Sequence, residues 1–404
     1  MSFFDVSTVS TKKPSPSLIP RCGACGLYKD CKSPKMHVTG QGRKGILVIA
    51  EAPGEVEDDQ NEQLVGPTGQ LFRDVLRKFD VDLDRDCWKT NAIICRPEGN
   101  RTPTNDEIDH CRPNLLKAIR ELKPRMIMPL GGVAVRSLLG PLWREDVGPI
   151  SQWVGWKIPL QRYNCWITPI FHPSYVKRAE EKGGLREGPA IRVWFERHIE
   201  SALSLTGMPW DVVPDYKKQV RIVMNPEDVN SWIRKVLQSG GPVSFDYETN
   251  CLKPDNEESE IVSCAVCWKG EETIAYPFVG AAISATRDLL VSELPKIGAN
   301  AKFETRWSRS ILGVDVNNWV WDSMLSAHLL DNRRGITSVK FQGFVKLGQE
   351  DWSADIKPYL ESVNSKGINR IREVDLRSLL TYNGIDAVVE FELAKAQRKE
   401  MFGK

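Results

Sequence analysis

The sequence predicts two consecutive α/β domains within one chain. The chain has 404 residues, which exceeds one ordinary hydrophobic core and suggests two domains of about 200 residues each. In the first half, apolar strand-like runs alternate with amphipathic helical patterns, as is typical of a parallel sheet with helices on both faces. A segment with two prolines and mixed charge, residues 206–218, interrupts this alternation. The pattern that follows is rich in strands at first and in helices later.

The alternating pattern of the first half begins at residue 45. Each predicted strand runs into a loop that contains glycine, proline or polar residues, and a helical pattern or a helix-start signal follows. In open parallel sheets the ligand lies beyond the carboxyl ends of the strands, so we expect the functional side chains in these loops. The predicted strands cover residues 45–55, 89–97, 125–132 and 164–175, with a helix over 68–79, a helix-start signal in 100–107 and a further apolar run at 133–140.

The second half begins at residue 219, directly after the segment that we predict to be the interdomain linker. Four strands and one helix are expected before helices dominate to the end of the chain. One of these strands, PVSFDYETN, ends in acidic residues. The predicted strands are 219–224, 242–250, 261–268 and 272–279, and the helix covers 226–238.

The composition is that of a soluble globular protein. Hydrophobic residues make up 41% of the chain and charged residues 27%, and the net charge is +2. Contacts with nucleic acid must therefore come from local basic patches. No apolar run approaches the roughly 18 residues of a membrane helix, and the N-terminus lacks the pattern of a secretory signal. We expect residues 1–18 to be disordered, the ten cysteines to be reduced, and the protein to act in the cytoplasm without membrane contact.

Four cysteines of the first half have the spacing of a metal site. Thiolates bind soft metals, and a C-x2-C turn presents two sulphur atoms to one centre. The spacing alone fits a zinc ion and an iron–sulphur cluster equally well, and core packing is a third interpretation. Cys31 is a substitute ligand candidate, whereas Cys264 and Cys267 lie on opposite faces of an apolar strand and should simply pack in the core. The candidate ligands are Cys22, Cys25, Cys95 and Cys111.

Four segments of the first half resemble the family 4 uracil-DNA glycosylases. They are AEAPGEVED (50–58), VGPTGQLF (65–72), TNAIICRPEGNRTPT (90–104) and HPSY (172–175). The resemblance covers about residues 18–200 in the family's order. It implies a three-layer α/β/α domain over residues 19–205 with a parallel sheet, and a 4Fe–4S cluster on the four cysteines.

The resemblance also implies roles for individual residues in uracil excision. Such an enzyme flips the base out of the helix, binds its Watson–Crick edge and stabilises the departing base. An Asn side chain offers that edge a donor and an acceptor. Considered singly, His172 is more often a hydrogen-bonded loop residue and Glu57 a solvated one. The implied catalytic residues are Glu51, Glu57, Asn100 and His172, and the implied substrate-binding residues are Ala52, Leu64, Asn91 and Ser174.

One position departs from the glycosylase pattern. Where the family has an aromatic residue that stacks on the flipped uracil, an ungapped alignment from the first motif gives Leu64. Stacking of a base on an aromatic ring is worth about 1–3 kcal/mol. Leucine still supplies an apolar wall, so the expected loss is partial.

The second half contains carboxylates with the spacing of a two-cation site. Strand alternation places Asp246 and Glu248 on one face, and Tyr382 and Asp386 lie four residues apart on one side of a helix. Between these pairs lies NAKFE, which ends in Glu304. Convergent carboxylates suit two hard cations that activate water for phosphodiester cleavage.

The ordered set resembles the DEDDy 3′–5′ exonuclease domain of family A DNA polymerases over about residues 219–400. The resemblance implies a ribonuclease H-like domain with a mixed sheet over 219–404. It also implies that Asp246, Glu248, Glu304 and Asp386 hold two Mg²⁺ or Mn²⁺ ions and that Tyr382 orients the attacking water. Glu304 stands where the family usually has Asp, which shifts the carboxylate by about one ångström or more. The segment WDSMLSAHLLD (321–331) also resembles the family. Its Asp322 could compensate for the displaced carboxylate of Glu304, although the corresponding residue has a structural role in the family.

These features predict a DNA-processing hydrolase that acts on uracil-containing DNA and on single-stranded or frayed 3′ ends. Two other hypotheses remain: an exonuclease that has lost excision, and a polymerase accessory subunit that only binds DNA or uracil. In the binding hypothesis four basic residues contact phosphates. The sequence ends where a family A polymerase would continue, so we expect either a separate polymerase chain or a longer parent chain, and a bacteriophage source acting in the host cytoplasm. The basic residues are Arg96, Arg101, Lys177 and Arg178.

Overall fold

The computed structural model describes residues 22–143, 146–182, 188–255, 257–270, 272–362 and 367–403. The predicted disordered tail, residues 1–18, lies outside this part of the chain. The chain divides into two compact units. The first comprises residues 1–139 and 169–205, and the second comprises residues 140–168 and 206–404.

A five-stranded sheet organises the N-terminal half, with the strand order β2-β1-β3-β5-β4. Strands β2 and β3 pair in parallel with β1 on either side of it, whereas β4 pairs antiparallel with β5. Every residue of β1 is buried, as helices on both faces require. The sheet is therefore mostly parallel, as predicted, and the antiparallel edge strand was not predicted. The strands are β1 Ile46–Ala50, β2 Cys87–Asn91, β3 Met126–Pro129, β4 Ile158–Leu160 and β5 Cys165–Ile167.

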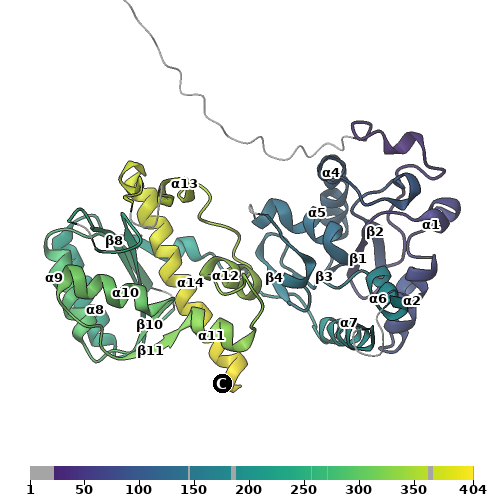
Figure 1. Cartoon of the computed structure of the whole chain (residues 1–404). Helices are drawn as coiled ribbons and strands as arrows, with labels where there is room; N and C mark the ends of the chain where they lie inside the picture. The colour runs from purple at the N-terminus through teal and green to yellow at the C-terminus, as the bar shows by residue number, and fades with distance from the viewer. Residues whose placement is uncertain are drawn as a thin grey trace, which may run out of the picture. The chain divides into compact units, whose positions relative to one another are not determined.

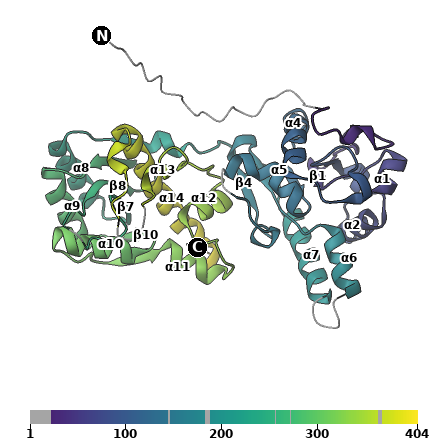
Figure 2. The same cartoon turned by 45° about the horizontal axis from the view of Figure 1, so that its top comes forward.

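Helices follow the strands of this half in the expected places. The predicted helix over 68–79 appears as α2, which begins with a proline at its first turn. The helix-start signal before residue 105 is a complete capping box, in which Thr104 and Glu107 each bond the other's backbone. Figures 1 and 2 show α6 and α7 side by side. The helices are α1 Glu55–Gln60, α2 Pro67–Arg77, α3 Leu83–Asp86, α4 Asn105–Leu122, α5 Gly131–Trp143, α6 Pro173–Lys182 and α7 Gly188–Leu203.

A six-stranded mixed sheet organises the C-terminal half, with the order β11-β10-β7-β8-β9-β6. The central strand β7 pairs antiparallel with β8 and in parallel with β10. The four predicted strands are present, whereas the two short strands β10 and β11 were not predicted. The strands are β6 Val220–Ile222, β7 Val243–Thr249, β8 Ile261–Trp268, β9 Glu272–Pro277, β10 Lys296–Gly298 and β11 Trp319–Asp322.

The two faces of this mixed sheet have separate hydrophobic cores. One core packs under α8 and α9 and contains Cys264, and the other packs under α14 and contains Cys267. Both thiols are fully buried in the core, so the prediction that they are packing residues is confirmed. The helices are α8 Pro226–Ser239, α9 Ala281–Val291, α10 Ala301–Trp307, α11 Ser323–Leu330, α12 Val339–Leu347, α13 Lys357–Leu360 and α14 Leu376–Phe402.

An aromatic cluster holds residues 140–168 within the second unit. The rings of Trp143 and Trp153 each pack on Phe341 and Phe344 of α12, with ring centres 5.2–5.9 Å apart. Aromatic pairs at such distances contribute about 0.5–1.5 kcal/mol each beyond the area they bury. Residues 140–168 lie inside the predicted 19–205 domain, yet they pack with the C-terminal residues.

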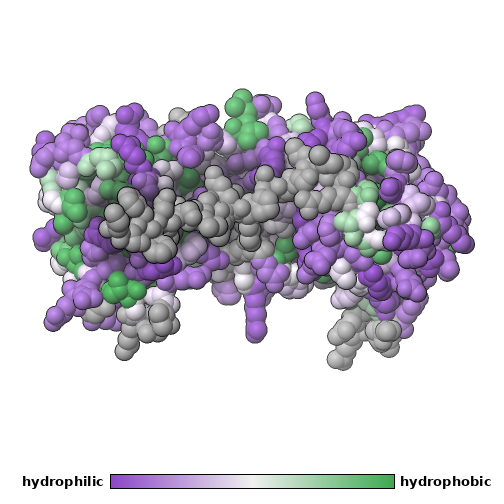
Figure 3. Space-filling view, turned by 90° about the horizontal axis from the view of Figure 1, so that it is seen from above, coloured by the Kyte–Doolittle hydropathy of each residue, from purple (hydrophilic) through white to green (hydrophobic). Residues whose placement is uncertain are grey.

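The face of the molecule in Figure 3 is mainly polar, with hydrophobic residues scattered among the hydrophilic ones. Within the described residues, no helix is long and apolar enough to cross a membrane.

Helix α14 approaches the edge strand β6 most closely at Gly384. A methyl group at this position would lie 2.3 Å from a methyl carbon of Val220. We predict that Gly384→Ala destabilises the protein by about 1–3 kcal/mol, because overpacking outweighs the roughly 1 kcal/mol that alanine adds to a helix.

Urea denaturation followed by tryptophan fluorescence measures this effect. The double variant Gly384→Ala/Val220→Ala is the matched control, because it removes the carbon that the new methyl group meets. It should recover most of the lost stability. Equal destabilisation of the single and double variants would contradict the packing argument.

Candidate functional site

The carboxyl ends of four strands meet at one edge of the N-terminal sheet. Ala50 pairs directly with Asn91, and the loop after β2 continues alongside, with the Ile93 amide bonded to the Glu51 carbonyl. The Gly131 amide bonds to the Ile170 carbonyl, which brings the chain before His172 to the same edge. The edge at the carboxyl ends of the strands therefore carries Glu51, Asn91 and His172, as expected.

Asn91 has an unsatisfied donor at this edge. Its side chain is 2% exposed, and its Nδ2 atom has no hydrogen-bond partner among the described residues. A buried amide donor without a partner costs about 1–3 kcal/mol. An amide kept in this state is ready to bond an acceptor atom of a ligand.

His172 is held as a neutral imidazole with a defined tautomer. Its Nδ1 atom accepts the backbone N–H of Ser174 at 3.2 Å and lies 2.7 Å from the Ser174 hydroxyl. Because Nδ1 is an acceptor, the ring proton of the neutral form resides on Nε2. Burial, aided by the charge of Arg178, lowers the pKa of His172 to about 4. The side chain is therefore a neutral N–H donor near pH 7.

Glu51 and His172 share a cationic neighbour. Burial raises the pKa of Glu51, and the charge of Arg178 opposes that rise. Arg178 thus acts electrostatically on both predicted catalytic groups. Sequence reasoning had assigned Arg178 only to phosphate contact.

Glu57 holds the loop that carries Leu64. Its Oε1 atom accepts the backbone N–H groups of Val65 at 3.1 Å and Gly66 at 2.7 Å. Leu64 is buried and has a φ of 55°, which is uncommon for a residue with a bulky side chain. The contacts of Glu57 are those of a positioning residue, and they fix the backbone of the loop in this conformation.

The other predicted site residues of this unit are exposed or half-buried. Asn100 is exposed, and its Oδ1 atom accepts a hydrogen bond of 2.8 Å from Arg96. Ala52 and Ser174 are half-buried. Arg101 donates two bonds of 2.6 and 2.9 Å to Glu107 of the capping box, and 45% of its side chain is exposed.

The four cysteines predicted as metal ligands line one cavity. Backbone N–H groups point at two of the sulphur atoms, from Lys35 to Cys95 at 3.2 Å and from Ile94 to Cys111 at 3.4 Å. Such donors stabilise thiolates, and they accompany the sulphurs of iron–sulphur sites. Burial raises the pKa of Cys95 to about 11 and that of Cys111 to about 12, so a cationic centre is needed to hold them as thiolates. The cavity is lined by Cys22, Cys25, Cys95 and Cys111 together with Leu27, Tyr28, Ile93 and His110.

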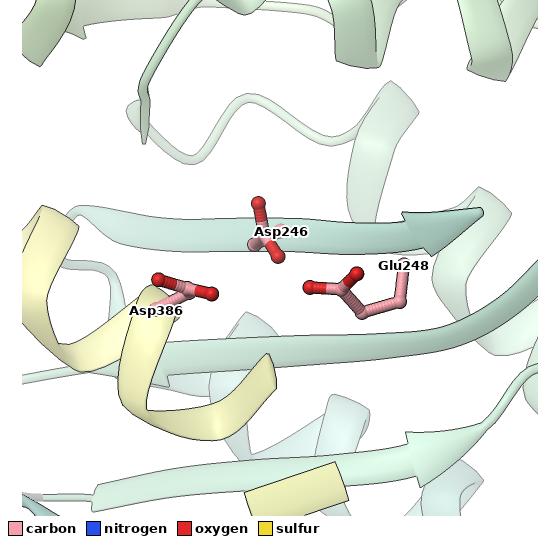
Figure 4. Close-up of side chains that lie close together, drawn as sticks. All are labelled: Asp246, Glu248 and Asp386. Carbon is pink, nitrogen blue, oxygen red and sulfur yellow. The ribbon is translucent and has the colours of Figure 1, made fainter. Parts of the chain in front are cut away.

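Three carboxylates converge in the C-terminal unit. Oxygens of Asp246, Glu248 and Asp386 lie within 4.8 Å of one another. Figure 4 shows the two strand residues and the helix residue turned toward a common point. Oxygen ligands at this spacing suit a hard divalent cation.

A second group of residues holds these carboxylates in place. Asn383 donates to Oδ2 of Asp246 at 2.7 Å. Trp352 donates its indole N–H to Asp386 at 3.1 Å, and Lys340 forms an ion pair with the same carboxylate. The Lys340 ammonium also lies 4.1 Å from the ring centre of Trp352 and 4.4 Å from that of Tyr382.

Glu304 lies beside the convergent set and outside it. Glu304 is 3% exposed, and its Oε2 atom has no hydrogen-bond partner among the described residues. Burial and the charge of Asp246 raise the pKa of Glu304. Asp322 does not join the carboxylates, because its two oxygens accept four backbone N–H groups, those of residues 300, 301, 324 and 325. It therefore fixes the loop before α10 and the start of α11.

Burial and mutual repulsion dominate the electrostatics of this site. Burial raises the pKa of Asp246 and of Glu248 well above the usual range, and the neighbouring carboxylates raise both further. Burial also raises the pKa of Asp386, against the lowering effect of Lys340. So many buried acids in contact favour bound cations or bound protons.

Four residues around this site were missed by sequence reasoning. Lys340 and Trp352 reach it from parts of the chain that carry no motif, and Asn383 lies inside the Tyr382-x3-Asp386 pattern. The fourth, Glu390, is a buried carboxylate one turn beyond Asp386. Its i, i+4 spacing from Asp386 was a signal that could have identified it.

Comparisons with known proteins match both halves of the chain. Residues 37–199 match the uracil DNA glycosylase superfamily, and residues 220–401 match a 3′–5′ exonuclease family. The type-4 uracil-DNA glycosylase of Pyrobaculum aerophilum is 38% identical over 187 residues, which are 45% of this chain and 88% of that protein. A DNA polymerase of Bacillus phage SP01 is 25% identical over 328 residues, 73% of this chain and 33% of that polymerase. A crystal structure of Escherichia coli RNase D, at 10% identity, gives a TM-score of 0.37 over 46% of this chain and 45% of that one.

The pKa of His172 gives a prediction with a defined sign. An unfolded histidine titrates near 6.5, and the folded His172 titrates at about 4. The unfolded state therefore binds more protons between these values, so stability falls as the pH decreases from about 6.5 to 4. The loss attributable to this residue is at most on the order of 3 kcal/mol.

NMR spectroscopy of histidine-labelled protein measures this pKa directly, with His172→Gln used to assign the signal. We expect the signal to remain that of a neutral ring with its proton on Nε2 down to about pH 5. His172→Gln should also flatten the decrease in melting temperature below pH 6.5, and His37→Gln, at an exposed position of the same unit, should not. A His172 signal that titrates near pH 6.5 would contradict the prediction.

Proposed function

Because the chain belongs to the uracil-DNA glycosylase superfamily and carries a 3′–5′ exonuclease domain after it, we propose that it is a DNA-processing hydrolase with two activities. It excises uracil from DNA in its N-terminal domain and removes nucleotides from 3′ ends in its C-terminal domain. The proposal rests on the groups present in each unit. One unit contains an unsatisfied Asn91 amide and a neutral His172, and the other contains the three convergent carboxylates.

In uracil excision, Asn91 binds the flipped base and His172 stabilises it as it departs. The unpartnered Nδ2 atom of Asn91 donates to a carbonyl oxygen on the edge of the flipped base. The Nε2–H of His172 donates to the base oxygen that gains charge as the glycosidic bond breaks. A water oxygen bonds to the sugar C1′ as the bond from C1′ to the base nitrogen breaks, and the proton that the water loses balances the one gained by the uracil anion. The products are free uracil and an abasic site. We assign the orientation of that water to Glu51 and Asn100, and we assign contacts with the base and its phosphate to Ala52 and Ser174.

Glu57 acts in this proposal by positioning. Its two bonds to the backbone of the loop fix Leu64 as the apolar wall of the base pocket. A leucine side chain lacks the π-face on which a base would stack. Loss of that stacking favours a second candidate function, in which the N-terminal domain binds DNA or uracil without excision and only the exonuclease is active.

The four cysteines fit a 4Fe–4S cluster, and we propose that Cys22, Cys25, Cys95 and Cys111 hold it. Their shared cavity and the N–H groups aimed at two of the sulphurs support this assignment. When bound, the cluster ties the N-terminal segment to the loop after β2 and to α4. Cys31, which acts electrostatically on Cys95, is the substitute ligand.

In the exonuclease reaction, the chain holds the scissile phosphate and a water molecule together. Two divalent cations, Mg²⁺ or Mn²⁺, would lower the pKa of the water and stabilise the leaving oxygen. Asp246, Glu248, Glu304 and Asp386 provide the oxygen ligands, and the Tyr382 hydroxyl orients the water. The new bond joins the water oxygen to phosphorus, the bond from phosphorus to the 3′ oxygen breaks, and a 5′-nucleotide leaves.

We propose that the glycosylase domain covers residues 19–205, the linker 206–218 and the exonuclease domain 219–404. The two family matches, at 37–199 and 220–401, support this division. We also propose that a DNA polymerase acts alongside the protein in the cytoplasm, with single-stranded or frayed DNA as the shared substrate. This partner is proposed from the resemblance of the chain to part of a phage DNA polymerase.

A single labelled oligonucleotide tests both activities. Single-stranded DNA with a 5′ label and one internal uracil is incubated in EDTA and then treated with alkali, or is incubated with Mg²⁺. We expect one alkali-dependent band in EDTA and a ladder of 3′-shortened products with Mg²⁺. Absence of the band together with a full ladder would favour the second candidate function, and intact DNA in both samples would contradict the proposal.

Two variants should separate the activities. Asp246→Ala should reduce the ladder by about 10³-fold or more, because it removes a shared cation ligand, and should leave the alkali-dependent band unchanged. His172→Ala should reduce uracil excision by about 10²–10³-fold, as expected for the loss of one donor to a developing oxyanion, and should leave the ladder unchanged. Each variant is the control for the other.

Iron analysis tests the cluster assignment. Protein prepared without oxygen should contain about four iron atoms per chain and absorb near 400 nm. Cys111→Ala should lose most of this iron, whereas Cys165→Ala, which removes a buried thiol outside the cavity, should keep it. Stoichiometric zinc in place of iron would overturn the assignment.

A further inference from the structure

Helix α14 carries a third functional residue in line with Tyr382 and Asp386. Glu390 follows Asp386 by four residues and Tyr382 by eight, so the three side chains lie on one face of the helix. That face packs along β7 and β8 of the sheet. Glu390 is 2% exposed and therefore lies in the interior, one helical turn beyond the convergent carboxylates.

Two buried carboxylate oxygens in this region have no hydrogen-bond partner. They are Oε2 of Glu390 and Oε2 of Glu304, each without a partner among the described residues. A buried and unpaired carboxylate is strongly unfavourable, because burial removes its hydration and nothing replaces it. The charge of Glu304 acts on Glu390, so one cation bound by both residues would satisfy both oxygens.

The charges around Glu390 indicate that the missing group is positively charged. The carboxylates of Asp246, Glu304 and Asp386 all act on Glu390 electrostatically, and Lys340 opposes them. Lys340 forms its ion pair with Asp386, so its charge is already engaged on one side of the site. The ion pair with Asp386 therefore leaves the negative charge of Glu304 and Glu390 to be compensated by another group.

We propose that Glu390 is a ligand of the second divalent cation of the exonuclease site, together with Glu304 and Asp246. This inference rests on the proposed exonuclease function and identifies one more ligand within it. Mg²⁺ and Mn²⁺ take about six oxygen ligands, and a further carboxylate completes a cation position beside the set formed by Asp246, Glu248 and Asp386.

The lengths of the acidic side chains agree with this arrangement. Glu304 stands where the exonuclease family usually has the shorter Asp, and Asp322 is fully engaged by backbone N–H groups. Asp322 therefore cannot compensate for the change. Glu304 is on α10 and Glu390 on α14, so a second cation bound by both would connect these two helices.

A shared proton is the competing explanation for the two unpaired oxygens. In that case Glu304 and Glu390 would form a neutral carboxylic acid paired with a carboxylate, and the second cation would not depend on Glu390. The two explanations differ in the number of cations that the chain binds, which can be counted without any measurement of activity.

The test counts Mn²⁺ ions bound by the full chain. Free Mn²⁺ is measured by electron paramagnetic resonance during titration of the wild type, Glu390→Gln and Glu392→Gln. Glu392 is on the same helix and pairs with Lys395 at the surface, so its variant is the matched control. We expect about two ions per chain for the wild type and for Glu392→Gln. For Glu390→Gln we expect one ion, with the second bound at least about 10-fold more weakly.

Melting temperatures verify folding and provide an independent readout. In EDTA, Glu390→Gln should melt at or above the wild-type temperature, because a buried charge is removed. Added Mn²⁺ should raise the melting temperature of the wild type by more than that of Glu390→Gln. Glu390→Asp, which keeps the charge on a shorter arm, should weaken the second ion to an intermediate degree.

The outcomes separate the two levels of the proposal. If the wild type binds two Mn²⁺ ions and degrades DNA while Glu390→Gln binds both ions with unchanged affinity, the role of Glu390 is wrong and the exonuclease assignment stands. If the wild type binds no Mn²⁺ at millimolar concentration and leaves 3′ ends intact, the exonuclease function itself is wrong, and the Glu390 proposal is overturned with it.

Discussion

The C-terminal unit depends on the packing of α14 against β7, which forces acidic side chains into a buried space. Asp246 and Glu248 enter this space from the strand and Asp386 enters it from the helix (Figure 4), and Glu390 is buried one turn farther along the same helix. Burial and like charge both oppose their ionisation. The contact between helix and strand persists because hydrophobic cores lie on both faces of the sheet. Stability gained by the cores therefore offsets the unfavourable electrostatics of the site.

Several polar contacts keep this helix and strand in register. Asn383 bonds both the side chain of Asp246 and the hydroxyl of Ser263, and Ser244 donates to the carbonyl of Ala387. These bonds fix the rotation of α14, so Tyr382, Asp386 and Glu390 face the strand together. The absence of a side chain at Gly384 permits the close approach to β6 on the adjacent face. The site is thus a consequence of one fixed contact.

The N-terminal unit arranges its functional groups without excess charge. Its predicted residues lie at strand ends, where backbone hydrogen bonds set their positions, and its central donors are the neutral groups Asn91 and His172. Stabilisation of a departing base requires donors aimed at one oxygen and no cation. In the proposed functions, the same chain therefore combines a glycosylase site that uses neutral donors with an exonuclease site that uses cations among buried acids.

The sequence predicted those features that local periodicity encodes. Apolar runs gave β1, β3, β7 and β8, and the two-residue alternation placed Asp246 and Glu248 on one face. Short strands escaped prediction: β4 and β10 have three residues each, fewer than a periodic pattern needs. Lys340 and Trp352 also escaped it, because they reach Asp386 through tertiary packing from 46 and 34 residues away.

The four-residue spacing of a helix, applied only to Tyr382 and Asp386, did not identify Glu390. Helical spacing linked Tyr382 to Asp386, and the same spacing extends to Glu390, where a carboxylate on an apolar helix face is costly unless it has a function. The proposed second cation accounts for both the glutamate at position 304 and the carboxylate at position 390. In the proposed cation site, the side chain of Glu304 extends farther from α10 than an aspartate would, and Glu390 is contributed by α14. A cation bound by both residues would satisfy the two oxygens that have no partner among the described residues.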